Sequence, residues 1–473
     1  MSTQTTNDIP SPRRPAGDAG LLRDTCGGAV HLPGDPGYDA ARQPWNVAVD
    51  QRPAAVAYPA DAHEVAEVVR AAAAAGLRIA PQGTGHNARP LGALDDVVLL
   101  RTSGLTGVTI DPVARRATVG SGVLWLDVVE AAAAHGLAAL HGSSPDVGVA
   151  GYSLGGGIGW YARQHGMQAN SLTAVELVTA DGAIRRVDND NDPELFWGLR
   201  GGGGNFGVVT ALEFELYPIE TVYAGALVWD WTHAERVLRR WAEWTATAPD
   251  AVTTAYRILQ LPPIEAVPPP LRGRQVVMID GAVLADDAEA AAMIAPLREL
   301  EPEMDTFWRM PAPALVRLHG DPEGPTPSIG SSTLLGSLPD DAAAAFVAAA
   351  GPGSGSTLLV AELRQLGGAL GRPALDAGCL PAVDAAFVVF TVAMAVHPEA
   401  AAVGLRDARA LVAAMSPWTN GRSYLNFAED AVDTRTAYAD DVYARLQALR
   451  AAVDPAGLFV ANHAVPAATA RPA

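Results

Sequence analysis

The pattern of apolar and polar positions between residues 55 and 100 predicts a strand–helix–strand unit. A short apolar run, Val56–Tyr58, precedes Asp61, and Glu64 follows three positions later, which is the capping-box pattern that begins a helix. The Ala-rich segment behind it ends at Gly76, a residue typical of helix C-termini. Two further strands are predicted at 77–80 and 97–100.

Residues 108–216 predict a second unit that is rich in hairpins. Val175–Thr179 and Ile184–Val187 flank Asp181-Gly182, a two-residue turn typical of β-hairpins. The apolar residues between 212 and 216 alternate with Glu, as in a half-buried strand. The other elements predicted here are strands at 108–110 and 117–119, a helix at 123–135 and a short helix at 193–199.

Beyond Pro218 the pattern changes to Ala-rich helices, scattered strands and Pro-rich loops, which indicates a separate α+β domain. The last segment predicts a strand at Ser423–Phe427 and a helix at Thr434–Val453. The predicted divisions are a disordered tail at 1–20, a first domain at 21–220 with two lobes split near 105–115, a second domain at 221–419 and a C-terminal segment at 420–473.

Charge and composition exclude some classes of function. The formal net charge is −19, which disfavours nucleic acid and anionic membrane surfaces as partners. The chain has no Lys, so a Schiff-base or P-loop lysine mechanism is excluded. Arg in place of Lys, with abundant Ala and Gly, is typical of a GC-rich bacterial genome. No metal-ligand pattern is present, and no metal site is predicted.

Targeting features and cysteines favour a cytoplasmic protein. Arg13-Arg14 is not followed by an apolar segment, so an export signal is not expected. The longest apolar run, Phe387–Val396, is shorter than the roughly 20 residues needed to span a membrane. Cys26 and Cys379 form no CxxC pair, so they are interpreted as incidental thiols in a reducing compartment.

A Gly-rich loop directly after the predicted strand at 77–80 is the first candidate binding site. It reads Pro81-Gln82-Gly83-Thr84-Gly85-His86-Asn87. Small residues let the backbone approach a ligand closely and expose successive N–H groups, an arrangement suited to a pyrophosphate. His86 lies inside this loop.

The densest glycine region, Gly142–Gly159, is the second candidate site. Its apolar residues argue against a flexible linker, because linkers are polar. It also contains Gly151-Tyr152-Ser153-Leu154-Gly155, which fits the G-x-S-x-G elbow of α/β-hydrolases and leaves Ser153 open as a nucleophile. The glycine spacing does not fit a Rossmann fingerprint.

Four blocks in order make the chain resemble the FAD-linked oxidases of the berberine-bridge-enzyme-like family. The blocks are the Gly-x-Gly-His-Asn loop, the segment 148–159, Leu199-Arg200-Gly201-Gly202-Gly203-Gly204-Asn205-Phe206-Gly207, and Asp454-Pro455 with Phe459 and Asn462-His463. The resemblance implies an α+β fold: a two-lobed FAD-binding domain of the p-cresol methylhydroxylase (PCMH) and vanillyl-alcohol oxidase type, to which 420–473 returns, plus an α+β substrate domain whose antiparallel sheet is covered by helices.

The resemblance also implies how FAD is held. The family's histidine, here His86, is bonded to the 8α carbon of the flavin. Many members add a cysteine from Cys-Pro-x-Val-Gly, but Ser144 stands at that position, so a single covalent link is expected. Val147 is the small residue typical of members that admit oxygen. The implied cofactor-binding residues are Pro81, Gln82, Gly83, Thr84, Gly85, His86, Asn87, Gly142, Ser143, Ser144, Val147, Gly148, Gly151, Tyr152, Leu154, Gly155, Gly157, Gly159 and Asn462.

The catalytic side departs from the family pattern. Where relatives have Tyr-x-Asn-Tyr, this chain has Tyr424-Leu425-Asn426-Phe427, and phenylalanine cannot act as a base. The implied catalytic candidates are Tyr424, Asn426, Glu429 and Arg364.

The resemblance implies an oxidase that acts on a small organic substrate, an alcohol, sugar, amine or secondary metabolite, with molecular oxygen as acceptor. A flavin dehydrogenase with another acceptor, the Ser153 hydrolase and a non-catalytic flavin-binding protein stay open as alternatives. No nucleic-acid or membrane partner is expected, and either a monomer or a homodimer fits.

Overall fold

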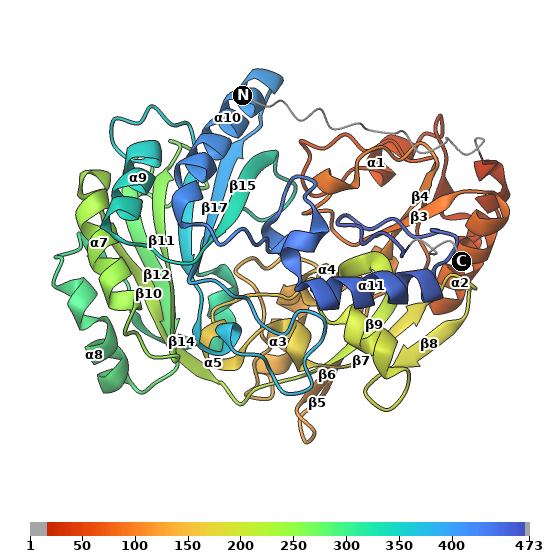
Figure 1. Cartoon of the computed structure of the whole chain (residues 1–473), viewed down its shortest axis with the longest axis horizontal. Helices are drawn as coiled ribbons and strands as arrows, with labels where there is room; N and C mark the ends of the chain where they lie inside the picture. Colours follow the sequence, from red (N-terminus) through yellow and green to blue (C-terminus); the bar gives the residue numbers. More distant parts are fainter. Residues whose placement is uncertain (1–16, 469–473) are drawn as a thin grey trace.

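Three β-sheets organise the computed structural model, which describes residues 17–468 (Figure 1). The first sheet has the order β1-β2-β4-β3, with β1 at Val30–His31, β2 at Ala55–Ala57, β3 at Arg78–Gln82 and β4 at Val97–Arg101. Strands β2 and β3 run parallel to β4, and helix α2 (Ala62–Ala74) makes the crossover. The predicted cap forms in part: Asp61 accepts from the His63 and Glu64 N–H groups, but Glu64 accepts from the N–H of Ala60, one residue before the N-cap. A short helix, α1 (Tyr38–Ala41), precedes β2.

The second sheet is antiparallel, in the order β5-β6-β9-β7-β8. The predicted hairpin around Asp181-Gly182 forms between β7 and β8, and the alternating residues 212–215 lie in β9. The core of this lobe contains the fully buried rings of Trp125, Phe196 and Phe214. Its strands are β5 (Val108–Asp111), β6 (Arg116–Gly120), β7 (Leu172–Val178), β8 (Ile184–Val187) and β9 (Val208–Glu215); its helices are α3 (Trp125–Ala133), α4 (Val149–Leu154), α5 (Ala162–His165) and α6 (Pro193–Leu199).

The third sheet, called the large sheet here, is antiparallel, with path β13-β10-β12-β11-β16-β17-β15 and with β14 also paired to β10. Helices α7, α8 and α9 cover the face that points away from the two smaller sheets, and α10 packs against β15 and β17 (Figure 1). The strands are β10 (Thr221–Asp230), β11 (Val252–Gln260), β12 (Gln275–Val283), β13 (Met304–Asp305), β14 (Trp308–Pro311), β15 (Ser328–Leu335), β16 (Val360–Gln365) and β17 (Phe387–Met394); the helices are α7 (Ala234–Thr245), α8 (Asp287–Arg298), α9 (Asp340–Ala350) and α10 (Pro398–Ala414).

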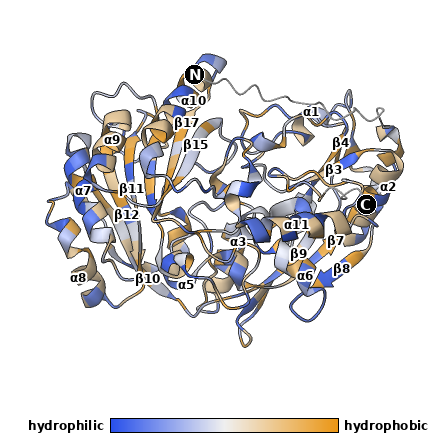
Figure 2. Ribbon diagram, viewed as in Figure 1, coloured by the Kyte–Doolittle hydropathy of each residue, from blue (hydrophilic) through white to orange (hydrophobic). Residues whose placement is uncertain are grey.

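Side-chain alternation gives the two faces of the large sheet different chemistry. Tyr256 on β11, Ile279 on β12 and Leu363 on β16 belong to the core beneath the helices. Their neighbours point to the opposite face, because successive strand residues alternate. Those neighbours are the charged residues Arg257, Asp280, Glu362 and Arg364. Figure 2 shows the hydrophobic strands behind helices that carry hydrophilic outer faces.

The C-terminal segment returns to the first sheet. Helix α11 (Asp440–Val453) packs against α6, and the Ile79 N–H donates to the Leu458 carbonyl at 2.8 Å. Asp454 accepts from the N–H groups of Leu458 and Phe459, which fixes the turn after α11.

Two predictions for this segment were wrong. Ser423–Phe427 is not a strand; Leu425–Phe427 is a 3-10 turn. The helix predicted from Thr434 begins at Asp440, because Tyr438 is extended and its buried hydroxyl donates to the Gly201 carbonyl at 2.9 Å. A separate 3-10 turn at Thr434–Ala437 precedes it.

The N-terminal prediction falls partly outside the described residues. The expected disordered tail covered 1–20, and residues 1–16 are not described. Ala19–Leu22 forms a 3-10 turn capped by Asp18, so structure begins before Gly20. Within residues 17–468, no helix is both long and apolar enough to cross a membrane.

Candidate functional site

A cavity of about 470 Å³ lies where the three sheets meet, within the size range of small-molecule sites. It is lined by most of the residues predicted from sequence: Pro81 to Asn87, Gly142, Ser143, Ser144, Val147, Gly148, Gly151, Tyr152, Leu154, Gly155, Arg364, Tyr424, Asn426, Glu429 and Asn462. The cavity therefore brings together segments between Trp45 and His463 that lie far apart in the sequence.

Gly157 and Gly159 do not line the cavity, so their predicted contact with a cofactor is not supported. A Cβ at Gly157 would lie 2.4 Å from the Tyr152 ring, and one at Gly159 would lie 1.8 Å from the His141 carbonyl oxygen. These glycines allow close packing around Tyr152. Other lining residues were missed by sequence reasoning: Trp45, Ser121, Gly201 to Gly204, Arg257, His319, Asp321, Glu362 and His463.

His86 stands at the cavity wall with a fixed ring plane. Its ring stacks on the Trp45 indole, with centroids 3.9 Å apart and planes 17° apart. Its Nδ1 lies 2.7 Å from the Thr84 hydroxyl oxygen, and its Nε2 lies 3.5 Å from Asp146 Oδ1. The side chain is 23% exposed, so a ligand in the cavity has access to the ring.

The glycine-rich loops provide space and donors of the kind that FAD requires. A Cβ at Gly151 or Gly203 would meet no atom within 4 Å, so their backbone faces open space in the cavity. The side-chain oxygens of Asn87 and Ser121 are buried beside the cavity and have no hydrogen-bond partner among the described residues. Buried polar atoms are normally hydrogen-bonded, so these atoms fit a polar cofactor.

The hydrolase interpretation of Ser153 is wrong. Ser153 lies inside helix α4, which begins at Val149. The hydrolase elbow requires a strand that leads directly into the helix, and no strand leads directly into α4. The side chain is fully buried. Helix α4 instead presents Gly151 and Tyr152 to the cavity.

The 424–427 segment lines the cavity, and Leu425–Phe427 within it forms a 3-10 turn. Asn426 Nδ2 donates to the Tyr152 carbonyl at 2.9 Å, which ties this turn to α4. The Tyr424 hydroxyl is buried and makes no hydrogen bond of normal geometry among the described residues, and burial raises its pKa well above the usual range although the nearby Gly157 N–H and Asn426 oppose part of that rise. A phenol with a raised pKa is a poor base, so Tyr424 is better suited to donate a hydrogen bond.

Glu429 is the carboxyl group at the cavity with the strongest tendency to bind a proton near neutral pH. Its Oε2 is buried without a partner among the described residues. Burial raises the pKa of Glu429 to about 7, and Arg89 and the Gly330 N–H oppose only part of that rise. Glu429 also lines a neighbouring cavity of about 80 Å³, so it stands between two spaces.

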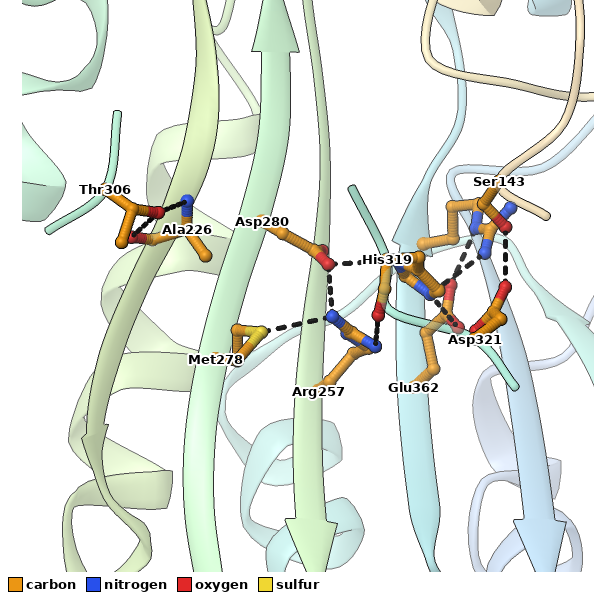
Figure 3. A network of polar contacts seen from close by, with 10 residues as sticks. Ser143, Ala226, Arg257, Met278, Asp280, Thr306, His319, Asp321 and Glu362 are labelled. Carbon is orange, nitrogen blue, oxygen red and sulfur yellow. Dashed lines mark hydrogen bonds and ion pairs between the residues drawn. The ribbon is translucent and has the colours of Figure 1, made fainter. Parts of the chain in front are cut away.

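A buried charged cluster forms the large-sheet wall of the cavity (Figure 3). His319 Nδ1 lies 2.9 Å from Asp280, and its Nε2 lies 3.2 Å from Glu362. Burial and Arg257 disfavour protonation, but the two carboxylates outweigh them and raise the pKa of His319 to about 9. Arg364 donates to Glu362 at 2.6 Å. The wall therefore presents fixed charges that a polar substrate can contact.

Both cysteines are free, buried thiols. Burial raises the pKa of Cys26 to about 11 and that of Cys379 further, which disfavours the reactive thiolate form.

The comparisons with known proteins identify the type of fold and its cofactor domain. Residues 53–188 match the FAD binding domain family. Over 203 residues the chain is 38% identical to (R)-6-hydroxynicotine oxidase of Paenarthrobacter nicotinovorans, covering 43% of this chain and 44% of that protein. Over 210 residues it is 33% identical to xylooligosaccharide oxidase of Thermothelomyces thermophilus, covering 42% of each. The chain thus matches less than half the length of these curated relatives.

Two solved structures extend the likeness over nearly the whole chain. The 6-hydroxy-D-nicotine oxidase of Arthrobacter nicotinovorans aligns with a TM-score of 0.77 and 26% identity, covering 91% of this chain and 96% of that one. The berberine-bridge-like (BBE-like) protein of Physcomitrella patens aligns with a TM-score of 0.82 and 20% identity, covering 93% and 97%. Fold and site define a flavoprotein with a PCMH-type FAD-binding domain and an antiparallel-sheet partner, as predicted. The chain is similar to berberine-bridge-enzyme-like FAD-linked proteins in its FAD-binding domain and in its fold.

Proposed function

We propose that the protein is an FAD-dependent oxidase that takes hydride from a small organic substrate and uses molecular oxygen as acceptor. One observation carries this proposal. A single cavity is lined by His86, the glycine-rich loops, Glu429 and Arg364, in a chain whose residues 53–188 match an FAD binding domain. Bound FAD would supply the redox chemistry, accepting hydride and passing its electrons to oxygen as peroxide.

The proposed cofactor contacts come from three loops. The backbone of 83–87, 142–155 and 201–204 would hold FAD, and His86 would form a single covalent bond to it. Ser144 does not offer a second bond, because its hydroxyl donates to Asp146 at 3.0 Å and it has no thiol. Val147 lines the cavity as a small side chain, which supports access of oxygen.

Glu429 is the proposed general base. A base works best when its pKa is close to the working pH, and Glu429 meets that condition better than Tyr424. Glu429 would take the substrate's O–H or N–H proton as hydride leaves. Tyr424 would orient the substrate through its free hydroxyl, and Asn426 would position Tyr152.

The proposed substrate is an alcohol, sugar, amine or secondary metabolite with polar groups. The charged wall around Arg364 and His319 favours such a molecule over a purely apolar one. The relatives' names include a nicotine oxidase and an oligosaccharide oxidase, which supports this range. We also propose a cytoplasmic location, a monomer or homodimer, and a substrate domain at 221–419.

The first experiment asks where the flavin remains after denaturation. In the purified protein, precipitated with acid and washed, yellow colour is expected to stay in the pellet. In His86→Ala the colour is expected to move to the supernatant. His63→Ala, which removes an exposed histidine on α2, is the matched control and should keep the colour. Peroxide release on addition of candidate substrates then tests the oxidase. A protein that binds no FAD would overturn the proposal.

A further inference from the structure

The Asp146 carboxylate gathers donors from three segments around His86. Its Oδ2 accepts from the Trp45 indole N–H at 2.6 Å and from the Gly324 backbone N–H at 2.7 Å. Its Oδ1 accepts from the Ser144 hydroxyl at 3.0 Å and faces His86 Nε2 at 3.5 Å. Contacts within the protein therefore orient both carboxylate oxygens of Asp146 without a cofactor.

The two nitrogens of His86 have different surroundings. Nε2 faces a carboxylate, which can accept only. Nδ1 faces the Thr84 hydroxyl at 2.7 Å, which can either donate or accept. The hydrogen bond made by one imidazole nitrogen decides which nitrogen carries the proton. Nε2 itself makes no hydrogen bond among the described residues, but its charged neighbour at 3.5 Å is the Asp146 carboxylate, whose negative charge favours the proton on Nε2 and leaves the lone pair on Nδ1.

We propose that Asp146 is a positioning residue for flavin attachment: it holds the proton of His86 on Nε2, so that Nδ1 is the nitrogen that bonds to the flavin. The inference rests on the covalent link proposed above. Stacking on Trp45 fixes the ring plane, and Trp45 itself is held by the same carboxylate. Asp146 therefore controls both the orientation and the tautomer of the nucleophile.

The bond balance of attachment shows what Asp146 contributes. A bond forms between His86 Nδ1 and the methyl carbon at flavin position 8, and one C–H bond of that methyl breaks. The released proton and the histidine proton are taken up by the flavin ring or the solvent, and two electrons stay on the ring. Molecular oxygen removes these electrons and yields peroxide. The carboxylate stabilises the imidazole as it becomes positively charged.

Asp146 is suited to this task because it stays ionised. Burial alone would raise its pKa, but contacts with His86, the Gly324 N–H and Trp45 hold the pKa well below the usual range. Gly324 belongs to the loop that precedes β15, so docking of the large-sheet region completes the arrangement.

Asp146→Asn tests the inference with little change in shape. The amide oxygen can take the place of Oδ2 and keep the bonds from Trp45 and Gly324. The amide NH₂ then faces His86 Nε2 as a donor, which reverses the preferred tautomer. Asp340→Asn is the matched control, because it makes the same change at an exposed carboxylate on α9 that contacts Arg239 and does not line the cavity.

Apo-protein from riboflavin-depleted cells is mixed with FAD, and covalent incorporation is followed by flavin fluorescence of the denatured band. For Asp146→Asn we expect incorporation to slow by about ten- to a hundred-fold, the range expected when a carboxylate no longer stabilises the charge that develops on the imidazole. Non-covalent FAD affinity and the unfolding midpoint should stay within about two-fold and a few degrees of wild type. Asp340→Asn should incorporate flavin at close to the wild-type rate.

A second measurement does not depend on any variant. NMR of the flavin peptide from wild-type protein identifies the bonded nitrogen, and Nδ1 is expected. Bonding through Nε2, or wild-type incorporation in Asp146→Asn, would overturn the inference while leaving the covalent flavin intact. Wild-type protein that binds FAD but never forms the bond would overturn the proposed covalent link instead, and the inference with it.

Discussion

At the scale of single residues, the site depends on how burial sets proton affinity. Glu429 and Tyr424 lie on the same short segment, and burial raises the pKa of both. The pKa of the Glu429 carboxyl is raised into the neutral range, where the group exchanges its proton easily. The pKa of the Tyr424 phenol is raised further away from that range. Both residues were catalytic candidates from the sequence. Only their surroundings show which of them is the better base.

The pH dependence of oxidation should report Glu429. As a base it must be ionised, so the rate is expected to rise with pH through about 7. Glu429→Gln should lower the rate of substrate oxidation by roughly 10²–10⁴-fold and remove that rise. Stopped-flow flavin reduction measures both, with the exposed Glu243→Gln as control. An unchanged pH profile in Glu429→Gln would assign the proton to another group.

At the scale of elements, strand alternation builds the charged wall. Each of β11, β12 and β16 sends one set of residues to the helix-covered core and the other set to the opposite face, where Arg257 on β11 and Glu362 and Arg364 on β16 line the cavity. His319 joins them from the turn that follows Ala312–Arg317 and lies between two carboxylates. The wall stays buried because its charges are paired.

Because of the charged wall, we expect the protein to become less stable in alkaline solution. The pKa of His319 is raised from 6.5 to about 9 in the fold, so its contribution is fully present below pH 6.5 and is lost as pH rises through about 9. The free energy of unfolding should fall by about 1–3 kcal/mol over this window. Urea titrations at several pH values measure it. His319→Gln should flatten the dependence, and a slope equal to wild type would contradict the assignment.

We expect that only glycine is tolerated at position 155, at the C-terminal end of α4. A Cβ at Gly155 would lie 1.9 Å from the Asn426 side-chain oxygen, so Gly155→Ala must displace the 424–427 turn. We expect a loss of about 1–3 kcal/mol in the free energy of unfolding and weaker FAD binding. Gly371→Ala, where a Cβ meets no atom within 4 Å, is the control. Equal FAD titrations for both variants would show that the turn adapts.

At the scale of the whole molecule, the large sheet is fixed to the smaller sheets by buried contacts. Arg163 on α5 donates to the Val252 carbonyl at 2.7 Å, to the Ala248 carbonyl at 2.9 Å and to the Leu366 carbonyl. Trp160 and Tyr161 pack in one apolar cluster with Val222 and Leu315. The cavity is formed only when these contacts hold the layers together.

Arg163→Met should weaken this attachment. Four carbonyl groups, the three above and that of Pro249, lose their donor, and at about 1 kcal/mol each the free energy of unfolding should fall by about 3 kcal/mol or more. Arg372→Met removes an exposed arginine near the same contact and should change it by less than about 0.5 kcal/mol. Guanidinium denaturation, followed by Trp fluorescence, compares the two. Similar losses in both variants would argue against a role for Arg163 in attachment.

The sequence by itself determined the features that depend on neighbouring residues. The helix cap at Asp61 and Glu64, the hairpin at Asp181-Gly182 and the glycine loop before His86 are local, because their hydrogen bonds span few positions. Four such motifs in order also predicted the family and FAD. Where a distant contact outweighed local preference, as at Tyr438, the predicted helix began too early.

Only the tertiary structure decided which side chains share the cavity. Asp146 is 60 positions from His86 in sequence, and Arg257, His319 and Glu362 come from three separate segments of the large-sheet region. The residues next to a charged residue in sequence do not show that it will line the cavity with other charged residues. Its partners depend on the register of the sheet and on how the layers pack together. The sequence therefore determined the fold and the cofactor loops, and the packing of the layers decided the polar surface that a substrate would meet.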